Sequence, residues 1–388
     1  MSSRTIDQAG ELRSSAIESL RALAALGVLE SHLWGVAHRW GPAASATFFD
    51  RIVYGGGFGV YLFFALTGYL LYRPFARRDL AGGRAVRVST YLRNRALRVL
   101  PLYYVTLVVF MIVVAHGGSP GQWWRFAFFL QNFFTSTVST VDGPMWSLVV
   151  EVQFYVLLPV AALLIARLAR GSAARAMGVL AGAGVLAELI RLATVTLRHD
   201  DSLRWHCSLP STCVFFVGGM FVAVLEVTWA GRRPDWLRGV FASATAWLAA
   251  SVVLWLVVFY DNSLDVLVVP ASALLIGAVV LPLERTSVVD LLEWRPLASI
   301  GVVSYSIYLW HLPIILKIAA RSWAPSNFLL LLLLFVPMIL VISFLSYRLV
   351  EAPFLRLRGN WGERTVASPT ALGTAAASVE LPGDVELA

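Results

Sequence analysis

An arginine and a histidine interrupt the first apolar stretch of the sequence. Arg21 and His32 are eleven residues apart. In an α-helix they would project from nearly the same face, about 16 Å apart along the axis. Ionisable groups are costly inside a bilayer, so we predict that Arg21 binds a ligand phosphate near the cytoplasmic end and that His32, lying deeper, is a general base. The alternative is structural: Arg21 reaches the membrane surface and His32 packs against another helix.

A carboxylate lies at a similar depth in a second apolar run. Glu151 stands about two turns into residues 145–168, where its side chain must be paired, hydrated or protonated. Pairing with His32 would select one imidazole tautomer and raise its basicity, so Glu151 is predicted to be the second catalytic residue. The alternative is a structural hydrogen bond to a neighbouring helix. Trp146 and Ser147, one turn earlier, are predicted to contact the substrate and are candidates to stabilise an oxyanion.

The apolar run 299–320 is rich in aromatic residues and contains a histidine. Tyr305 and Tyr308 are three residues apart and are predicted to line a substrate path. His311 lies near the middle of the membrane and is a third predicted substrate contact. Trp310 is a further candidate oxyanion donor. The alternative for this segment is an aromatic packing surface between helices.

Two arginines lie one helical turn apart at the start of an apolar run. Arg95 and Arg98 share one helix face and lead directly into residues 98–116. Guanidinium groups bind phosphate oxygens in pairs, so this face is predicted to bind a phosphate. The alternative is a basic juxtamembrane segment that sets topology and contacts anionic lipid.

The overall composition is that of a membrane protein. Of the 388 residues, 58% are apolar and 14% are charged, whereas soluble domains are about 45–50% apolar and about 25% charged. The net charge of +8 comes almost entirely from arginine, since Lys317 is the only lysine. These arginines fall in short clusters between apolar runs, which indicates membrane topology and excludes a nucleic-acid partner.

The length of the apolar runs predicts an all-α, polytopic membrane protein with about ten transmembrane helices, since a span needs about 20 residues. With the N-terminus in the cytoplasm, 22 basic residues fall in inner segments and 6 in outer segments, which predicts that both termini are cytoplasmic. The predicted spans are 18–38, 52–74, 98–116, 145–168, 177–197, 211–229, 242–260, 264–283, 299–320 and 327–350.

Three regions follow from this pattern. Residues 1–17 form a cytoplasmic N-terminal segment, residues 18–356 form the membrane domain, and residues 357–388 form a disordered cytoplasmic tail rich in small and polar residues. The run 123–134 is too short to span and is interpreted as interfacial or re-entrant.

The cysteines and the remaining intramembrane charges are predicted to be structural. Cys207 and Cys213 cannot build a disulfide framework or a four-ligand metal site. Two free thiols are favoured over one disulfide, and no metal is expected. Glu188 and Arg191 are spaced for an ion pair within one helix.

Several separated motifs together resemble the acyltransferase family 3 membrane proteins. The resemblance covers about residues 15–355, and Tyr61 and Ala65 depart mildly from the family pattern, so Gly59 is assigned only a packing role. The motifs are Arg21 followed after ten residues by His32, Gly59-Val60-Tyr61-Leu62-Phe63-Phe64-Ala65-Leu66-Thr67-Gly68, Arg95-Ala96-Leu97-Arg98 with Pro101, Trp146-Ser147-Leu148 through Glu151 and Phe154-Tyr155, and Ser304-Tyr305 through Tyr308-Leu309-Trp310-His311.

The resemblance implies a cell-membrane O-acyltransferase that moves an acetyl or another short acyl group from acyl-CoA to a hydroxyl. It implies that the acceptor is a sugar, a glycolipid, a cell-surface polysaccharide, a peptidoglycan sugar or a macrolide-type natural product. It also implies that Arg21, His32, Arg95 and Arg98 are critical. The chain length is similar to that of the actinobacterial macrolide acyltransferases.

A mechanism consistent with these residues places the CoA phosphates on Arg95 and Arg98, the extended donor along Arg21, and the acceptor hydroxyl at His32. Arg21 is too far from His32 along a straight helix to stabilise the oxyanion, which needs donors about 3 Å away. Two other classes remain open. One is a transporter or flippase that moves an amphipathic or acylated molecule without chemistry, and the other is a lipid-binding scaffold.

Overall fold

The protein is all-helical, as predicted. The computed structural model describes residues 3–40, 47–197 and 202–358, and every regular element in these ranges is a helix. The only β-type pairing there is an isolated bridge between Ser243 and Glu284. Nearly all of the predicted tail, 357–388, lies outside the described residues.

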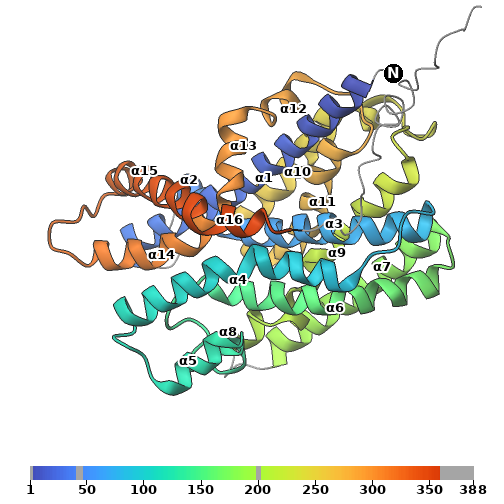
Figure 1. Cartoon of the computed structure of the whole chain (residues 1–388). Helices are drawn as coiled ribbons and strands as arrows, with labels where there is room; N and C mark the ends of the chain where they lie inside the picture. The colour runs from blue at the N-terminus through green and yellow to red at the C-terminus, as the bar shows by residue number, and fades with distance from the viewer. Residues whose placement is uncertain (1–2, 41–46, 198–201, 359–388) are drawn as a thin grey trace, which may run out of the picture.

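The helices follow one another with short connections (Figure 1). Their bounds are α1 Ser3–Ala37, α2 Phe48–Gly55, α3 Gly59–Leu80, α4 Val88–Val113, α5 Pro120–Ala127, α6 Met145–Ala169, α7 Ala173–Leu197, α8 Ser202–His206, α9 Leu209–Trp229, α10 Ala244–Tyr260, α11 Val268–Val280, α12 Ser287–Leu291, α13 Arg295–Val302, α14 Ser304–Ala319, α15 Phe328–Ser346 and α16 Ala352–Leu355. Short 3₁₀ segments cover Gly56–Phe58, Gln131–Phe133, Gly239–Ala242 and Asn262–Leu267, and a π-helical turn covers Tyr347–Glu351.

Seven helices of the described chain are long and apolar enough to cross a membrane, or eight when α13 and α14 are taken as one broken span bent by 67°. The predicted count of ten is therefore not reached by length and composition. α10 coincides with a predicted span but has only 17 residues. α1 also coincides with one, but it carries Glu18, Arg21 and Glu30 within that stretch. The protein is a multi-pass membrane protein, and the side that each terminus faces stays a prediction.

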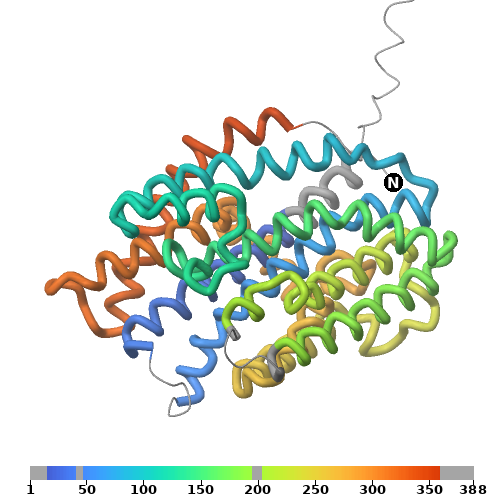
Figure 2. Tube along the Cα trace, turned by 90° about the horizontal axis from the view of Figure 1, so that it is seen from below, coloured from blue at the N-terminus to red at the C-terminus, as the bar shows by residue number. Residues whose placement is uncertain are grey.

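The long helices form a bundle whose members run side by side. α3, α4, α6, α7 and α9 lie roughly along the long axis of the molecule, α1 passes beside α3, and the α14–α15 hairpin lies at the end where α1 finishes (Figures 1 and 2). Many leucines and valines on the perimeter are exposed, such as Leu333, Leu349 and Val185. Exposed apolar side chains of this kind match lipid contact.

Two glycines let α1 approach its neighbours closely. A Cβ atom at Gly59 of α3 would lie 2.5 Å from the carbonyl oxygen of Ala24, and one at Gly301 of α13 would lie 1.8 Å from that of Glu18. Only glycine fits such contacts without displacing backbone. The packing role predicted for Gly59 is therefore confirmed, and the two contacts fix α1 on either side of Arg21.

The smaller predictions also have clear outcomes. Residues 123–134 form α5 and a 3₁₀ turn, too short to span. Cys207 and Cys213 are free thiols. Arg191 pairs with Glu188 at 2.6 Å within α7 and also with Asp265 at 2.9 Å.

Candidate active site

Two cavities open into the bundle and meet at two residues. The inner cavity is lined by the arginine-bearing ends of α1 and α4, including Arg21, Arg95 and Arg98, and has a volume of about 90 Å³. The outer cavity is lined by the other end of α1, including His32, and has a volume of about 940 Å³. The names follow the predicted orientation of the chain. Val60 and Tyr308 line both cavities.

α1 contributes one predicted residue to each cavity. Arg21 lines the inner cavity and His32 lines the outer one, and both belong to the continuous helix Ser3–Ala37. The structure thus keeps the two residues on one helix, as predicted, but in two adjoining cavities instead of one. A ligand in one cavity and a ligand in the other could therefore meet at Val60 and Tyr308.

His32 is held through Nδ1. This atom lies 2.8 Å from the carbonyl oxygen of Val28 and 3.1 Å from Nε2 of His311. His311, 1% exposed, has its own Nδ1 2.8 Å from the carbonyl oxygen of Tyr308. α14 therefore places a second imidazole directly against the first, with ring centroids 4.9 Å apart.

These contacts determine the tautomer of both rings. A carbonyl oxygen can only accept a hydrogen bond, so Nδ1 of His311 must carry hydrogen and its Nε2 must be a lone-pair acceptor. Nδ1 of His32 likewise carries hydrogen, which it shares between Val28 and His311. Nε2 of His32 is then unprotonated, and it has no hydrogen-bond partner among the described residues. A base is thus presented to the outer cavity.

The predicted pairing of Glu151 with His32 is wrong. Glu151 lines the inner cavity, where its carboxylate accepts hydrogen bonds from Thr67 (2.8 Å) and Tyr155 (3.0 Å). The partner of His32 is His311, for which a substrate contact was predicted; in the structure His311 lies behind His32, and both of its nitrogens are already in hydrogen bonds. The depth of a residue along its helix does not determine which neighbouring helix its side chain faces.

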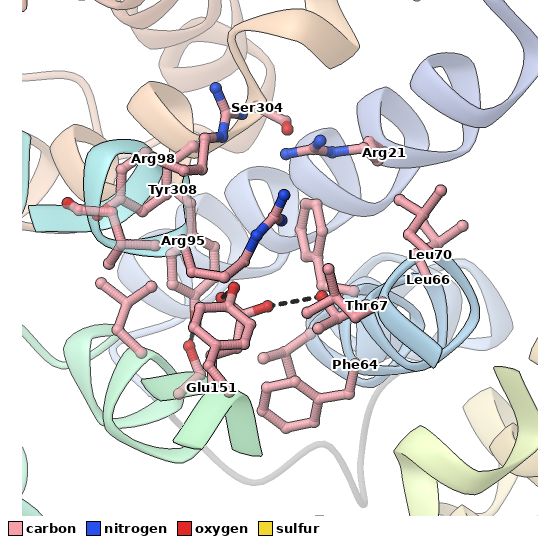
Figure 3. Close-up of a pocket in the computed structure, with 18 residues that line it drawn as sticks. Arg21, Phe64, Leu66, Thr67, Leu70, Arg95, Arg98, Glu151, Ser304 and Tyr308 are labelled. Atoms are coloured by element: carbon pink, nitrogen blue, oxygen red, sulfur yellow. Dashed lines mark hydrogen bonds between the residues drawn. The ribbon is translucent and has the colours of Figure 1, made fainter. Parts of the chain in front are cut away.

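The inner cavity concentrates positive charge. Figure 3 shows Arg21, Arg95 and Arg98 converging above Glu151 and Thr67. Arg98 pairs with the buried Glu351 at 2.8 Å, and Glu351 accepts a further hydrogen bond from Ser306. The buried Nε of Arg95, in contrast, has no hydrogen-bond partner among the described residues. A buried donor without a hydrogen-bond partner destabilises the fold, so the Arg95 guanidinium is a candidate to bind a ligand.

A fourth arginine completes this cluster. Burial, together with the neighbouring charges of Arg95, Arg98 and Arg21, lowers the pKa of Arg358 to about 10. Its buried Nε also lacks a partner within the described part of the chain. Arg358 was not predicted as a site residue, because it falls just inside the predicted tail, whose small and polar residues do not indicate packing. We call Arg21, Arg95, Arg98 and Arg358 the arginine cluster.

The remaining predicted substrate contacts lie near the junction of the cavities. Tyr308 and Ser147 share a hydrogen bond of 2.7 Å, and the Tyr308 hydroxyl also lies 3.1 Å from the Pro144 carbonyl oxygen. Trp146 lines the outer cavity. Tyr305 lines the inner cavity and donates to the carbonyl oxygen of Val99.

One residue predicted for this region makes its contact elsewhere. The indole of Trp310, a candidate oxyanion donor, instead donates to Ser346 at 3.0 Å, on the α15 side. No group of three or more His, Cys, Asp or Glu side chains that could hold a metal ion occurs within residues 3–40, 47–197 and 202–358.

Comparison with known proteins decides the family. Residues 14–348 match the acyltransferase family 3 profile, described as an acyltransferase domain. The chain belongs to this family. Acyltransferase family 3 membership agrees with the motifs on α1, α3, α4, α6 and α14, which are the helices that line the two cavities.

The curated relatives of this acyltransferase are distant. It is 26% identical over 374 residues to a putative peptidoglycan O-acetyltransferase of Bacillus subtilis, covering 88% of this chain and 55% of that protein. It is 27% identical over 383 residues to acyltransferase MdmB of Streptomyces mycarofaciens, covering 90% and 93%. A third relative is nodulation protein 10 of Rhizobium leguminosarum, 23% identical over 365 residues, covering 87% and 92%. The chain spans about half the length of the Bacillus subtilis protein and of the peptidoglycan O-acetyltransferase OatA of Listeria monocytogenes, which is 23% identical over 367 residues. No solved structure matches it.

Proposed function

We propose that this acyltransferase moves an acetyl or another short acyl group from acyl-CoA to a hydroxyl of a sugar-containing acceptor. The donor binds at the arginine cluster, and the acceptor binds in the outer cavity. The observation that carries the proposal is the base at His32: its Nδ1 is engaged by Val28 and His311, which leaves Nε2 to take a proton from a hydroxyl.

The donor assignment rests on charge and on unsatisfied donors. Coenzyme A carries phosphates on one end and a thioester on a narrow, flexible arm. Arg95 and Arg358 each have a buried Nε without a partner among the described residues, and guanidinium groups pair well with phosphate oxygens. The inner cavity, at about 90 Å³, is too small for the nucleotide and suits only the narrow arm. We therefore place the nucleotide at the mouth and the thioester near Val60 and Tyr308.

The transfer step needs no further reactant. Nε2 of His32 takes the proton of the acceptor hydroxyl while the hydroxyl oxygen attacks the thioester carbonyl carbon. The carbon–sulfur bond then breaks, and the departing thiolate takes the proton back from the imidazolium. The products are the O-acyl ester and free CoA. Donation from Nδ1 of His32 to His311 stabilises the imidazolium that forms in between, because hydrogen bonds to charged groups are the stronger ones.

The junction offers donors for the oxyanion. The hydroxyl of Tyr308 borders both cavities and is already positioned by Ser147 and the Pro144 carbonyl. A hydroxyl or indole donor within about 3 Å of the thioester oxygen would stabilise the tetrahedral intermediate. Trp146 is the side chain we assign as the candidate for this contact, because the single hydrogen of the Tyr308 hydroxyl is already engaged by the Pro144 carbonyl oxygen or by Ser147.

The test separates binding from chemistry. His32→Gln in the purified protein is expected to lower transfer from labelled acetyl-CoA by about 10²- to 10⁴-fold, the usual contribution of a general base, without changing acetyl-CoA binding. His38→Gln is the matched control, since His38 makes the same type of bond to the carbonyl four residues earlier. Wild-type turnover in His32→Gln would refute the base. Transport of the candidate acceptor with no acyl transfer by the wild-type protein would favour the transporter alternative.

A further inference from the structure

Asp142 is a buried carboxyl group that the transfer step does not use. It lies in the loop before α6, lines the outer cavity with His32, and is 3% exposed. Neither of its carboxyl oxygens has a hydrogen-bond partner among the described residues. Its backbone carbonyl accepts from the amide of Met145, so the main chain is used in starting α6 while the side chain is not.

A buried carboxyl group without hydrogen-bond partners destabilises the fold and makes no structural contact that offsets this. An unpartnered buried polar group destabilises the fold by about 1–3 kcal/mol. Burial raises the pKa of Asp142 well above its ordinary value, and no cation within the described part of the chain offsets this effect. The side chain does not cap α6, whose N-terminal cap is Pro144 without a side-chain bond. A ligand that supplies the missing partners would explain why this carboxyl group lines the same cavity as the proposed base, His32.

The surroundings of Asp142 indicate what this ligand is. The outer cavity is otherwise lined mainly by apolar and aromatic side chains, and its lining includes one other charged residue, Lys317, whose Nζ donates to the carbonyl of Val113. Pockets of this kind bind an apolar face and orient it with a few polar groups. The aromatic side chains are Trp40, Tyr54, Phe58, Tyr61, Trp146 and Tyr308.

We propose that Asp142 is the anchor for the acceptor. It accepts a hydrogen bond from a second donor group on the acceptor ring, adjacent to the hydroxyl that His32 deprotonates. The ligand class is therefore a ring that carries neighbouring donors, either a diol or an amino alcohol. This inference rests on the proposed function, and it adds a specificity-determining residue to the site.

Three matched glycosides test the assignment. Methyl glucopyranoside, its 2-amino-2-deoxy analogue and its 2-deoxy analogue differ only in the group next to one hydroxyl. Equilibrium binding to the purified protein, without donor, is compared between wild type and Asp142→Asn. Asp261→Asn is the control, since Asp261 is exposed and its carboxyl group accepts hydrogen bonds from Ser263.

We expect the three glycosides to differ in their affinity for the protein. Wild type binds the hydroxy glycoside more tightly than the 2-deoxy analogue by about 2- to 10-fold, the strength of a bond between uncharged groups, or binds the amino glycoside more tightly by about 10-fold or more, because its ammonium group is charged. Asp142→Asn removes most of this preference. A larger loss for the amino glycoside identifies an ammonium partner, and a similar loss for the hydroxy glycoside identifies a diol. Equal affinity for the 2-deoxy analogue in the wild type, or no binding of any of the three, overturns the ligand class.

A second readout does not depend on the ligand. If the carboxyl group is retained for binding, Asp142→Asn leaves the melting temperature of the empty protein unchanged or raises it. A clear fall in melting temperature means that Asp142 is a structural group, and the proposal fails. Acyl transfer by the wild type is measured separately, so the proposed function stands or falls independently of these outcomes.

Discussion

Replacing His311 separates the positioning of the base from its chemistry. In His311→Leu the acceptor for the Nδ1 hydrogen of His32 is lost, while the carbonyl of Val28 remains. The lost bond matters most when His32 is positively charged, during transfer. A hydrogen bond to a charged group contributes about 1.5–3 kcal/mol, which corresponds to a rate decrease of about 10- to 150-fold.

The assay is transfer from labelled acetyl-CoA to acceptor, with kcat and KM measured for both substrates. We expect the loss in kcat, because neither cavity described above is lined by His311. His311→Gln carries an amide oxygen at the end of a side chain of similar length and is expected to recover part of the rate. His38→Leu, which removes a histidine from the same end of α1, should keep the full rate.

Two results would contradict this account. Wild-type kcat in His311→Leu means that the bond between the imidazoles is irrelevant to catalysis. A raised KM with unchanged kcat means that His311 contacts the substrate, as the sequence analysis predicted. An unfolded His311→Leu protein is recognised by its melting temperature, and the rate of His311→Gln then decides the question.

The other predictions concern the donor site, pH and packing. Arg358→Gln should raise KM for acetyl-CoA by about 10- to 150-fold, the range for a bond to a charged partner. Arg356 is an exposed neighbour, so Arg356→Gln should leave KM unchanged. Equal effects of the two substitutions would remove Arg358 from the donor site. Burial raises the pKa of Asp142 in the folded state, so the stability that this group contributes is present below its unfolded pKa and is lost as pH rises through its folded pKa. The melting temperature of Asp142→Asn should therefore exceed that of the wild type by a margin that grows with pH. A margin that shrinks with pH would mean that the pKa of Asp142 is lowered in the folded state. Gly59→Val should destabilise the protein by about 1–3 kcal/mol through overpacking against Ala24, measured by thermal unfolding in detergent, and an unchanged melting temperature would show that α1 and α3 can separate freely.

The helices and the residues on them could be predicted from the sequence, because apolar length and 3.6-residue periodicity are local properties. Arg21 and His32 share one helix for this reason. The partner of His32 could not be predicted in the same way. Glu151 and His311 both lie at about the depth of His32, so either could contact it. The partner depends on which helix packs against α1, and close contacts such as that of Gly301 with Glu18 determine this packing.

Residues outside the spans were harder to place. Arg358 belongs to a stretch whose composition is typical of a tail, and only the turn of the chain after α15 brings it to Arg95 and Arg98. Asp142 lies in a loop with no periodic pattern, so its burial follows from tertiary packing alone. The seven or eight spans supported by length and composition differ from the predicted ten at three helices: α1, which carries three charged residues in the predicted stretch, the 17-residue α10, and the bent pair α13–α14.

The narrow contact between the two cavities has a consequence for the cell. Water can enter a protein of this kind from both sides, and each unit charge that crossed at 100 mV would dissipate about 2.3 kcal/mol of stored energy. Val60 and Tyr308 lie where the two cavities meet, and the hydroxyl of Ser147 bonds to Tyr308 there. Under the proposed function, the narrow acyl arm of the donor would reach this point, while hydrated ions would meet the apolar side chain of Val60 and the ring of Tyr308. Acyl transfer at this point would then leave the membrane potential intact.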